Sequence, residues 1–205
     1  MKVLKEFKKK LFKACKDALS RYRVEFQGLT DKDIDFICYK ASNHPLHYQS
    51  IIADEFQKRG IDPTRSIGAT LETLAELGWI GEGYSVRKAV ETVRGEIPLE
   101  EGFMEFDPYD MGLNIVLDGT YIKKLMEEYE IKEEEWEELE HLIEDLAYRG
   151  EIPDEAIVQV YVMDREDAED LLKAGIPVIE GAFSGYTIDP RYWRKAFEIL
   201  WRKMW

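Results

Sequence analysis

A series of short helical patterns, each closed by its own helix breaker, constrains the first part of this 205-residue chain most strongly. Between residues 30 and 78, apolar residues recur at steps of three and four in three successive segments. Asn-His-Pro at 43–45, residues 60–63 (Gly-Ile-Asp-Pro) and Gly78 interrupt the pattern. These breaks exclude one long helix and predict three short helices that pack together.

Each predicted helix has an inner face. Asp31 is the expected cap of the first helix, the second runs from about residue 46 to Arg59, and the third covers about 65–77. The expected inward residues, helix by helix, are Ile34, Ile37, Cys38 and Ala41; then Ile51, Ile52 and Phe56; then Ile67, Leu71, Leu74 and Leu77. Trp79-Ile80 and residues 84–87 then flank a Gly-Glu-Gly turn, which predicts a β-hairpin. Three helices followed by a hairpin form the winged-helix plan.

One stretch of this segment resembles a known family. Residues 43–48 (Asn-His-Pro-Leu-His-Tyr), followed by Ile-Ile-Ala-Asp-Glu-Phe at 51–56, are similar to the start of the HARE-type helix-turn-helix domain. That family continues with a Ser/Thr-rich third helix and a Gly-x-Gly-Tyr wing, whose places are taken here by residues 64–77 and 81–84. HARE domains occur in an RNA polymerase accessory subunit, in chromatin proteins and fused to nucleases. The resemblance, over about residues 30–90, implies a nucleic-acid or transcription setting and no particular reaction.

The net charge of −14 is distributed unevenly. Residues 1–28 carry nine Lys/Arg and three Asp/Glu, residues 29–95 carry eight and ten, and residues 96–205 carry eleven and 29. An acidic half repels polyanions, so we expect nucleic-acid contact within residues 1–95. The third helix offers only Arg65 against Glu72 and Glu76, which argues against base recognition by that helix although its hydroxyls (Thr64, Ser66, Thr70 and Thr73) suit phosphate. The expected polyanion contacts are Lys9, Lys10, Lys13, Arg65, Arg87, Lys88 and Arg94.

We predict four segments: a basic amphipathic helix at 1–28, a winged helix at 29–95, a linker at 96–112 and an acidic α+β domain at 113–205. The apolar stripe of the first helix, within residues 2–24, includes Leu4, Phe7, Leu11, Ala18 and Tyr22. Such a stripe packs on its own domain or on a second copy, giving a homodimer; nucleic acid and an anionic membrane are further alternatives for this helix. The overall class is α+β.

The C-terminal segment has its own helix and strand patterns. We expect helices at about 119–129 and 132–149, a strand at 156–163, and a short helix that begins after Asp164. A strand at 176–180 would complete a tight βαβ unit, and a last helix begins at residues 189–190. The glutamates of the second helix and the tryptophan-rich C-terminus suit docking on a basic protein partner. The residues expected there are Trp136, Glu137, Glu140, Trp193, Trp201 and Trp205.

No pattern supports catalysis, a cofactor or a metal. Cys38, His44 and His47 lack a fourth zinc ligand nearby, and Asp107, Asp110 and Asp118 do not have the spacing of a calcium loop, so a solvated acidic linker is expected. Cys15 and Cys38 cannot make a disulfide framework, and we expect small core residues in a reducing, cytoplasmic compartment. No apolar run is long enough for a membrane span.

The sequence thus predicts a non-enzymatic, cytoplasmic regulatory protein that contacts double-stranded DNA or RNA polymerase. The alternative is a protein-interaction module or inhibitor that uses the acidic helix and the tryptophan-rich C-terminus. The chain has only two Asn and four Gln beside abundant Glu and Lys, a bias reported for hyperthermophile proteins, so a source in a hot environment is a further hypothesis.

Overall fold

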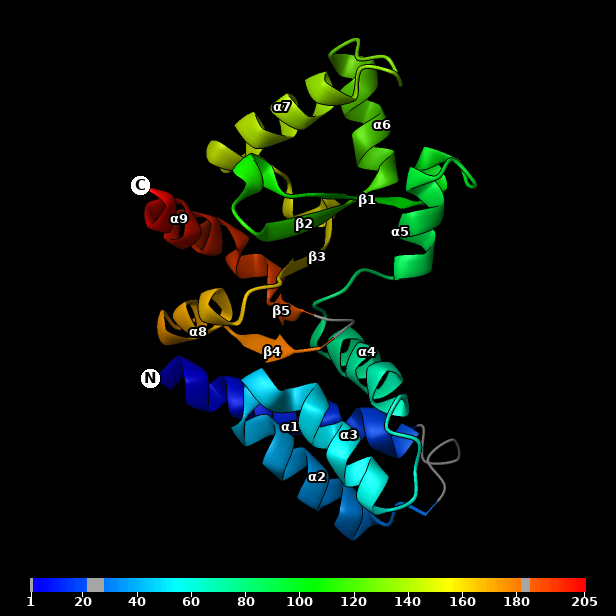
Figure 1. Cartoon of the computed structure of the whole chain (residues 1–205), viewed down its shortest axis with the longest axis vertical. Coiled ribbons are helices and arrows are strands. Elements are labelled where there is room, and N and C mark those ends of the chain that lie inside the picture. Colours follow the sequence, from blue (N-terminus) through cyan, green and yellow to red (C-terminus); the bar gives the residue numbers. More distant parts are fainter. Residues whose placement is uncertain (1, 22–27, 182–184) are drawn as a thin grey trace. The chain divides into compact units, whose positions relative to one another are not determined.

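The computed structural model describes residues 2–21, 28–181 and 185–205, and the chain forms two compact units (Figure 1). Unit 1 comprises residues 1–79 and 163–188, and unit 2 comprises residues 80–162 and 189–205. The mixed α+β class is confirmed. The division differs from the four predicted segments, because the basic helix and the three-helix segment share one unit and the acidic C-terminal segment is divided between both.

Unit 1 consists of helices and one small antiparallel hairpin. Its elements are α1 (Lys2–Arg21), α2 (Asp31–Asn43), the 3-10 turn η1 (Pro45–His47), α3 (Tyr48–Lys58), α4 (Arg65–Leu77), α8 (Arg165–Lys173), β4 (Val178–Glu180) and β5 (Tyr186–Ile188). Helix α1 packs on α2 and α4, and α3 packs on α2 and α4. The hairpin β4–β5 lies against η1 and α3, where Glu180 accepts hydrogen bonds from the backbone N–H and the hydroxyl of Ser50.

The apolar stripe of α1 is used within unit 1. Phe7, Leu11 and Ala18 are buried, and the Phe7 ring stacks on Trp79 at 5.6 Å between centroids. Packing on its own domain is therefore the alternative that the structure shows, and the buried stripe is not available to a second copy. Tyr22, also expected on this stripe, lies outside the described residues.

Cys15 of α1 and Cys38 of α2 form a disulfide, and both residues are fully buried. Our expectation that both cysteines are buried in the core is confirmed, but the expectation that they are free thiols is wrong. The pattern of apolar residues places both cysteines on inner faces, and two inner faces that pack together bring these side chains into bonding distance. Catalysis by either cysteine as a free nucleophile is excluded in this state.

Two details of the helices differ from the sequence prediction. The cap of α2 is Thr30 rather than Asp31, and Thr30 and Asp33 form a reciprocal capping box. On α4 the buried face holds Ser66, Thr70 and Thr73 besides Ala69 and Leu74, while Ile67 is exposed. Small hydroxyl residues allow close helix packing, and the Thr70 and Thr73 hydroxyls donate to backbone carbonyls one turn earlier. These buried hydroxyls do not face a phosphate.

Unit 2 is built on the antiparallel strands β1–β2–β3. Its helices and strands are α5 (Val86–Val93), β1 (Phe103–Phe106), β2 (Leu113–Asp118), α6 (Gly119–Glu128), α7 (Trp136–Tyr148), β3 (Ile157–Val162) and α9 (Trp193–Met204). Short 3-10 turns lie at Leu99–Glu101, Pro108–Asp110, Asp154–Ala156 and Pro190–Tyr192. One face of the sheet buries Leu113, Ile115 and Leu117, and helices α6 and α9 pack against this sheet (Figure 1). Tyr84 and Ala89 pack against Phe103 and Val116 on the other face.

The predicted wing is absent. No strand occurs in residues 79–85, and Ser85 caps α5 through the Lys88 backbone N–H where the second hairpin strand was expected. The predicted linker at 96–112 is also wrong, because it contains β1, whose Phe103 and Phe106 are buried. The described strand β4 pairs antiparallel with β5, so the predicted βαβ unit is not formed. The predicted helices at α6, α7, α8 and α9 and the strand β3 are present.

Candidate nucleic-acid interface

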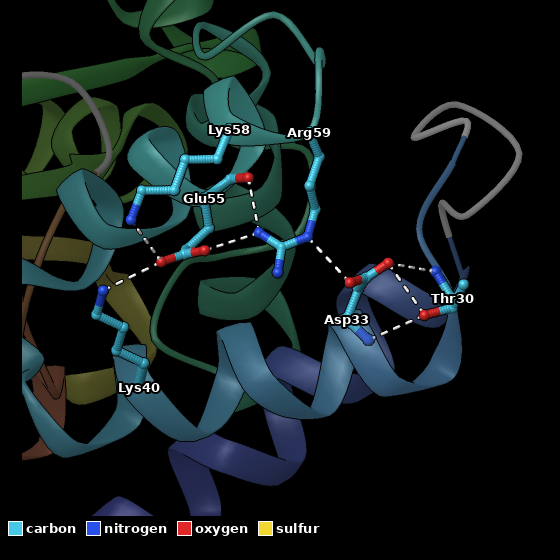
Figure 2. Close-up of polar contacts among 6 residues, drawn as sticks. All are labelled: Thr30, Asp33, Lys40, Glu55, Lys58 and Arg59. Carbon is cyan, nitrogen blue, oxygen red and sulfur yellow. Dashed lines mark hydrogen bonds and ion pairs between the residues drawn. The ribbon is translucent and has the colours of Figure 1, made fainter.

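A buried carboxylate surrounded by three cations joins α2 to α3 (Figure 2). The Glu55 side chain is only 3% exposed. It accepts hydrogen bonds from Lys40 Nζ at 3.1 Å, Lys58 Nζ at 3.3 Å and Arg59 Nη1 at 2.7 Å. Each cation comes from the rim of the helix pair, so the carboxylate holds three positively charged side chains on the outer surface of unit 1.

Arg59 extends this network to the start of α2. Its Nε donates to Asp33 Oδ1 at 3.0 Å, and its Nη1 also donates to the Glu55 carbonyl at 2.9 Å. Asp33 is at the same time the capping-box partner of Thr30 (Figure 2). The start of α2 and the end of α3 are therefore fixed to each other through one guanidinium.

The pKa shifts follow from these contacts. Burial alone would raise the pKa of Glu55, but hydrogen bonds from Arg59, Lys40 and Lys58 outweigh it and lower this pKa to about 2. The backbone hydrogen bond from Thr30, followed by the contact with Arg59, lowers the pKa of Asp33. Both carboxylates stay ionised at neutral pH. The cluster of three cations and two carboxylates then carries a formal charge of +1, and the Lys40 and Lys58 side chains are 42% and 63% exposed.

Two exposed aromatic residues lie on α2, and one of them contacts a cation of this cluster. Phe36 and Tyr39 of α2 are 54% and 67% exposed, although large aromatic side chains are usually buried. The Arg59 guanidinium carbon lies 5.9 Å from the Phe36 ring centroid, a cation–π distance. We call the surface that these residues form with their neighbours on the two helices the α2–α3 face; it comprises Lys32, Phe36, Tyr39, Lys40, Asn43, Lys58 and Arg59.

The seven predicted polyanion contacts fall in both units. Lys9, Lys10 and Lys13 are exposed on α1, and Arg65 is exposed at the start of α4, so these four lie in unit 1. Among the described residues, Lys9, Lys10 and Lys13 form no ion pair, whereas Lys16 of the same helix pairs with Asp35. The other three belong to unit 2, on or just after α5: Arg87, Lys88 and Arg94. All three are exposed, and Arg87 pairs with Glu91. They lie at a helix rather than on a wing.

The charge of the chain follows the unit boundary. Unit 1 contains 16 Lys/Arg and 17 Asp/Glu, whereas unit 2 contains 12 and 25. Unit 1 is therefore close to neutral, and almost all of the net negative charge belongs to unit 2. A polyanion is repelled far less by unit 1 than by unit 2.

The predicted partner-binding tryptophans have different environments within unit 2. Trp193 is fully buried and donates to Asp154, so its assignment to a partner surface is wrong. Trp136 stacks on Phe106 and donates to Glu140 at 2.5 Å. Trp205 is 83% exposed and contacts the ring of Trp201. Trp201 also belongs to the lining of a groove of about 490 Å³ formed by Ala147, Tyr148, Arg149, Gly150, Arg194, Phe197, Glu198, Trp201 and Arg202.

The candidate metal ligands have structural roles. Cys38 is in the disulfide, and His47 Nε2 accepts a hydrogen bond from Arg165 at 3.0 Å. Asp107 accepts from the Gly112 backbone N–H, and Asp118 caps α6. Among the described residues, no group of three His, Cys, Asp or Glu side chains could hold a metal ion. The described helices also include none that is long and apolar enough to cross a membrane.

The sequence prediction missed the residues of the α2–α3 face. A signal was present, because Phe36 and Tyr39 lie outside the apolar pattern of Ile34, Ile37 and Ala41 and therefore had to point away from the core. The role of Lys40, Lys58 and Arg59 was not visible, because it depends on α3 lying beside α2.

No family model, curated protein or solved structure matches this chain. The resemblance to the HARE domain therefore rests on the residues that carry it, and one of its features, the wing, is replaced by α5.

Proposed function

We propose that this protein is a non-enzymatic nucleic-acid-binding protein of regulatory function, in which unit 1 contacts phosphates. The separation of charge carries the proposal: unit 1 is nearly neutral and presents exposed lysines on α1 together with the cations of the α2–α3 face, while unit 2 is strongly acidic. Lysine and arginine bind phosphates regardless of base sequence. The residues proposed for phosphate contact are Lys9, Lys10, Lys13, Lys40, Lys58 and Arg65. The transcription setting and the cytoplasmic location belong to this proposal.

A titration of the full chain against fluorescently labelled nucleic acid tests the proposal. If each of the six proposed residues contacts one phosphate of a duplex, affinity for that duplex should fall on the order of 1,000-fold between ~0.05 and ~0.2 M salt. Replacing the three α1 lysines by Gln should reduce the slope of log affinity against log salt by about 2.7. The matched control replaces Arg87, Lys88 and Arg94 by Gln in unit 2 and should change this slope less. Absence of binding to single strands and duplexes at low salt would reject the proposal.

A second candidate is a protein-interaction surface on unit 2. The observation that favours it is the groove between α7 and α9, beside which Tyr148 and Trp205 are 60% and 83% exposed. The acidic side of α7, including Glu137 and Glu140, suits a basic partner, whereas α9 itself carries Arg194, Lys195, Arg202 and Lys203. A lysine-rich peptide should then bind the full chain, and Glu137→Gln with Glu140→Gln should weaken it. Equal binding by this variant would remove the candidate.

A further inference from the structure

We propose that the α2–α3 face binds single-stranded nucleic acid, with unpaired bases stacked on Phe36 and Tyr39 and the phosphates beside Lys40 and Lys58. This inference rests on the proposed function and specifies which form of nucleic acid unit 1 takes. It depends on the geometry of two exposed rings among cations, and each step follows from a contact in unit 1.

The two rings are placed as neighbouring stacking platforms. Phe36 and Tyr39 are three residues apart on α2, which puts their Cβ atoms about 5–6 Å apart on one side of a helix. Both residues are more than half exposed, at 54% and 67%. Every base has a π-face, so aromatic residues in such a position bind bases with little dependence on sequence.

Cations lie on the α3 side of α2, and an ion pair lies on its α1 side. On the α3 side, Arg59 lies over Phe36, and Lys40 and Lys58 hold their ammonium groups at the rim. On the α1 side, Lys16 pairs with Asp35 at 2.9 Å. A backbone that passes along α2 would therefore keep its phosphates close to positive charge while its bases reach the rings. The cluster around Glu55, with its formal charge of +1, favours a nucleic-acid strand over a cationic partner.

Contacts within unit 1 hold α2 and the cations of this face in place. Glu55 holds the three cations, and the capping box holds the start of α2. The disulfide joins α2 to α1 at Cys38, the residue before Tyr39. A preorganised surface loses less conformational entropy when it binds. Stacking on these rings is therefore expected to add affinity instead of being cancelled by ordering of the protein.

A duplex would not use this surface in the same way. Paired bases are stacked on each other, so their faces are closed to Phe36 and Tyr39. The usual duplex-binding element, the third helix of a helix-turn-helix, is α4, which offers Arg65 against Glu72 and Glu76 and buries Ser66, Thr70 and Thr73. The geometry thus favours unpaired strands over double helices.

The test measures the full chain against labelled oligo-dT and oligo-U of about 12 nucleotides and against a duplex of equal length. We expect tighter binding of the single strands; the two oligonucleotides distinguish DNA from RNA. Phe36→Ala and Tyr39→Ala should each weaken single-strand binding about 5- to 100-fold, with little change for the duplex. Phe36→Leu keeps the apolar area without the ring and should also weaken binding, whereas Phe36→Trp should preserve it.

A matched control and an independent signal complete the test. Tyr129→Ala replaces a tyrosine of similar exposure in unit 2 and should leave binding unchanged. In a Tyr39→Trp variant, stacking of a base should quench the fluorescence of the new tryptophan relative to the same titration with the duplex. Unchanged affinity of both alanine variants would overturn the inference while leaving the proposed function in place. Failure of every nucleic acid to bind at low salt would overturn both.

Discussion

At the scale of single residues, the buried carboxylate of Glu55 has the largest electrostatic consequence. The pKa of Glu55 is about 2 in the folded protein, against 4.5 for an exposed glutamate. Between pH 2 and pH 4.5 the folded state therefore binds fewer protons than the unfolded chain. The resulting stabilisation, about 3 kcal/mol, is fully present above about pH 5 and is lost as the pH falls towards 2. Ionised Glu55 stabilises the folded protein because folding lowers the pKa of this carboxyl.

We predict that Glu55→Gln lowers the free energy of unfolding by about 3 kcal/mol at pH 7. Lys40 and Lys58 are substantially exposed and regain hydration in the variant, which keeps the loss below the value for a fully buried ion pair. Urea unfolding at pH 7, 5 and 3 should show the gap between wild type and variant closing with acid. Glu6→Gln, at an exposed position of α1, is the control and should change the free energy of unfolding little. Parallel curves for wild type and Glu55→Gln would contradict the argument.

The same scale shows where sequence periodicity fails. On α4 the apolar residues Ile67 and Leu71 suggested one face, but the core takes Thr70 and Thr73, whose hydroxyls are satisfied by backbone carbonyls and, for Thr73, by Tyr48 at 2.7 Å. A threonine that satisfies its own hydroxyl packs like a small apolar residue. A pattern of apolar side chains cannot predict this burial, because the threonine hydroxyls find their carbonyl acceptors only once the helix has formed.

At the scale of elements, the disulfide between α1 and α2 joins positions 23 residues apart. Closing a loop of this length removes conformational entropy from the unfolded chain worth about 3 kcal/mol. We predict that the Cys15→Ala, Cys38→Ala double variant is less stable than the oxidised wild type by about this amount, measured by urea unfolding. Reductant should destabilise the wild type and leave the double variant unchanged.

The state of the cysteines can be checked separately. The wild type, denatured without reductant and treated with an alkylating agent, should take up no label, because neither Cys15 nor Cys38 is free. Two labels per chain would show that both thiols are free and would remove the basis of the stability prediction. The outcome also bears on compartment, since disulfides are rare in the cytosol of mesophiles.

Elements were predictable where local signals agreed and missed where they competed. Helices α2, α3, α7 and α9 combine clear periodicity with breakers or caps, and β3 is rich in β-branched residues. The wing was wrong because Gly81 and Gly83 suggest a hairpin turn, while Ser85 is also a good helix cap and the residues after it have a helical period. Strands β1 and β2 escaped notice because prolines and glycines around them indicated a linker.

At the scale of the whole molecule, the arrangement of units was beyond the sequence. The chain returns to unit 1 at residues 163–188, so the hairpin β4–β5 that packs against α3 is encoded far from it. Long-range pairing leaves no local pattern, because each strand is short and its partners are chosen by tertiary packing. The charge separation was visible in outline, but its boundary lies at Trp79 instead of residue 95.

Composition and cross-linking together make a prediction about thermal stability. The chain has few thermolabile amides, with two Asn and four Gln, and a buried disulfide of the kind that intracellular proteins of hyperthermophiles use. We expect the oxidised protein to melt above about 90 °C in scanning calorimetry, and the reduced protein to melt about 6–12 °C lower, because each kcal/mol shifts Tm by about 2–4 °C at this size. A Tm of about 45–65 °C for the oxidised protein would place it among ordinary mesophile domains and remove the hot-environment hypothesis.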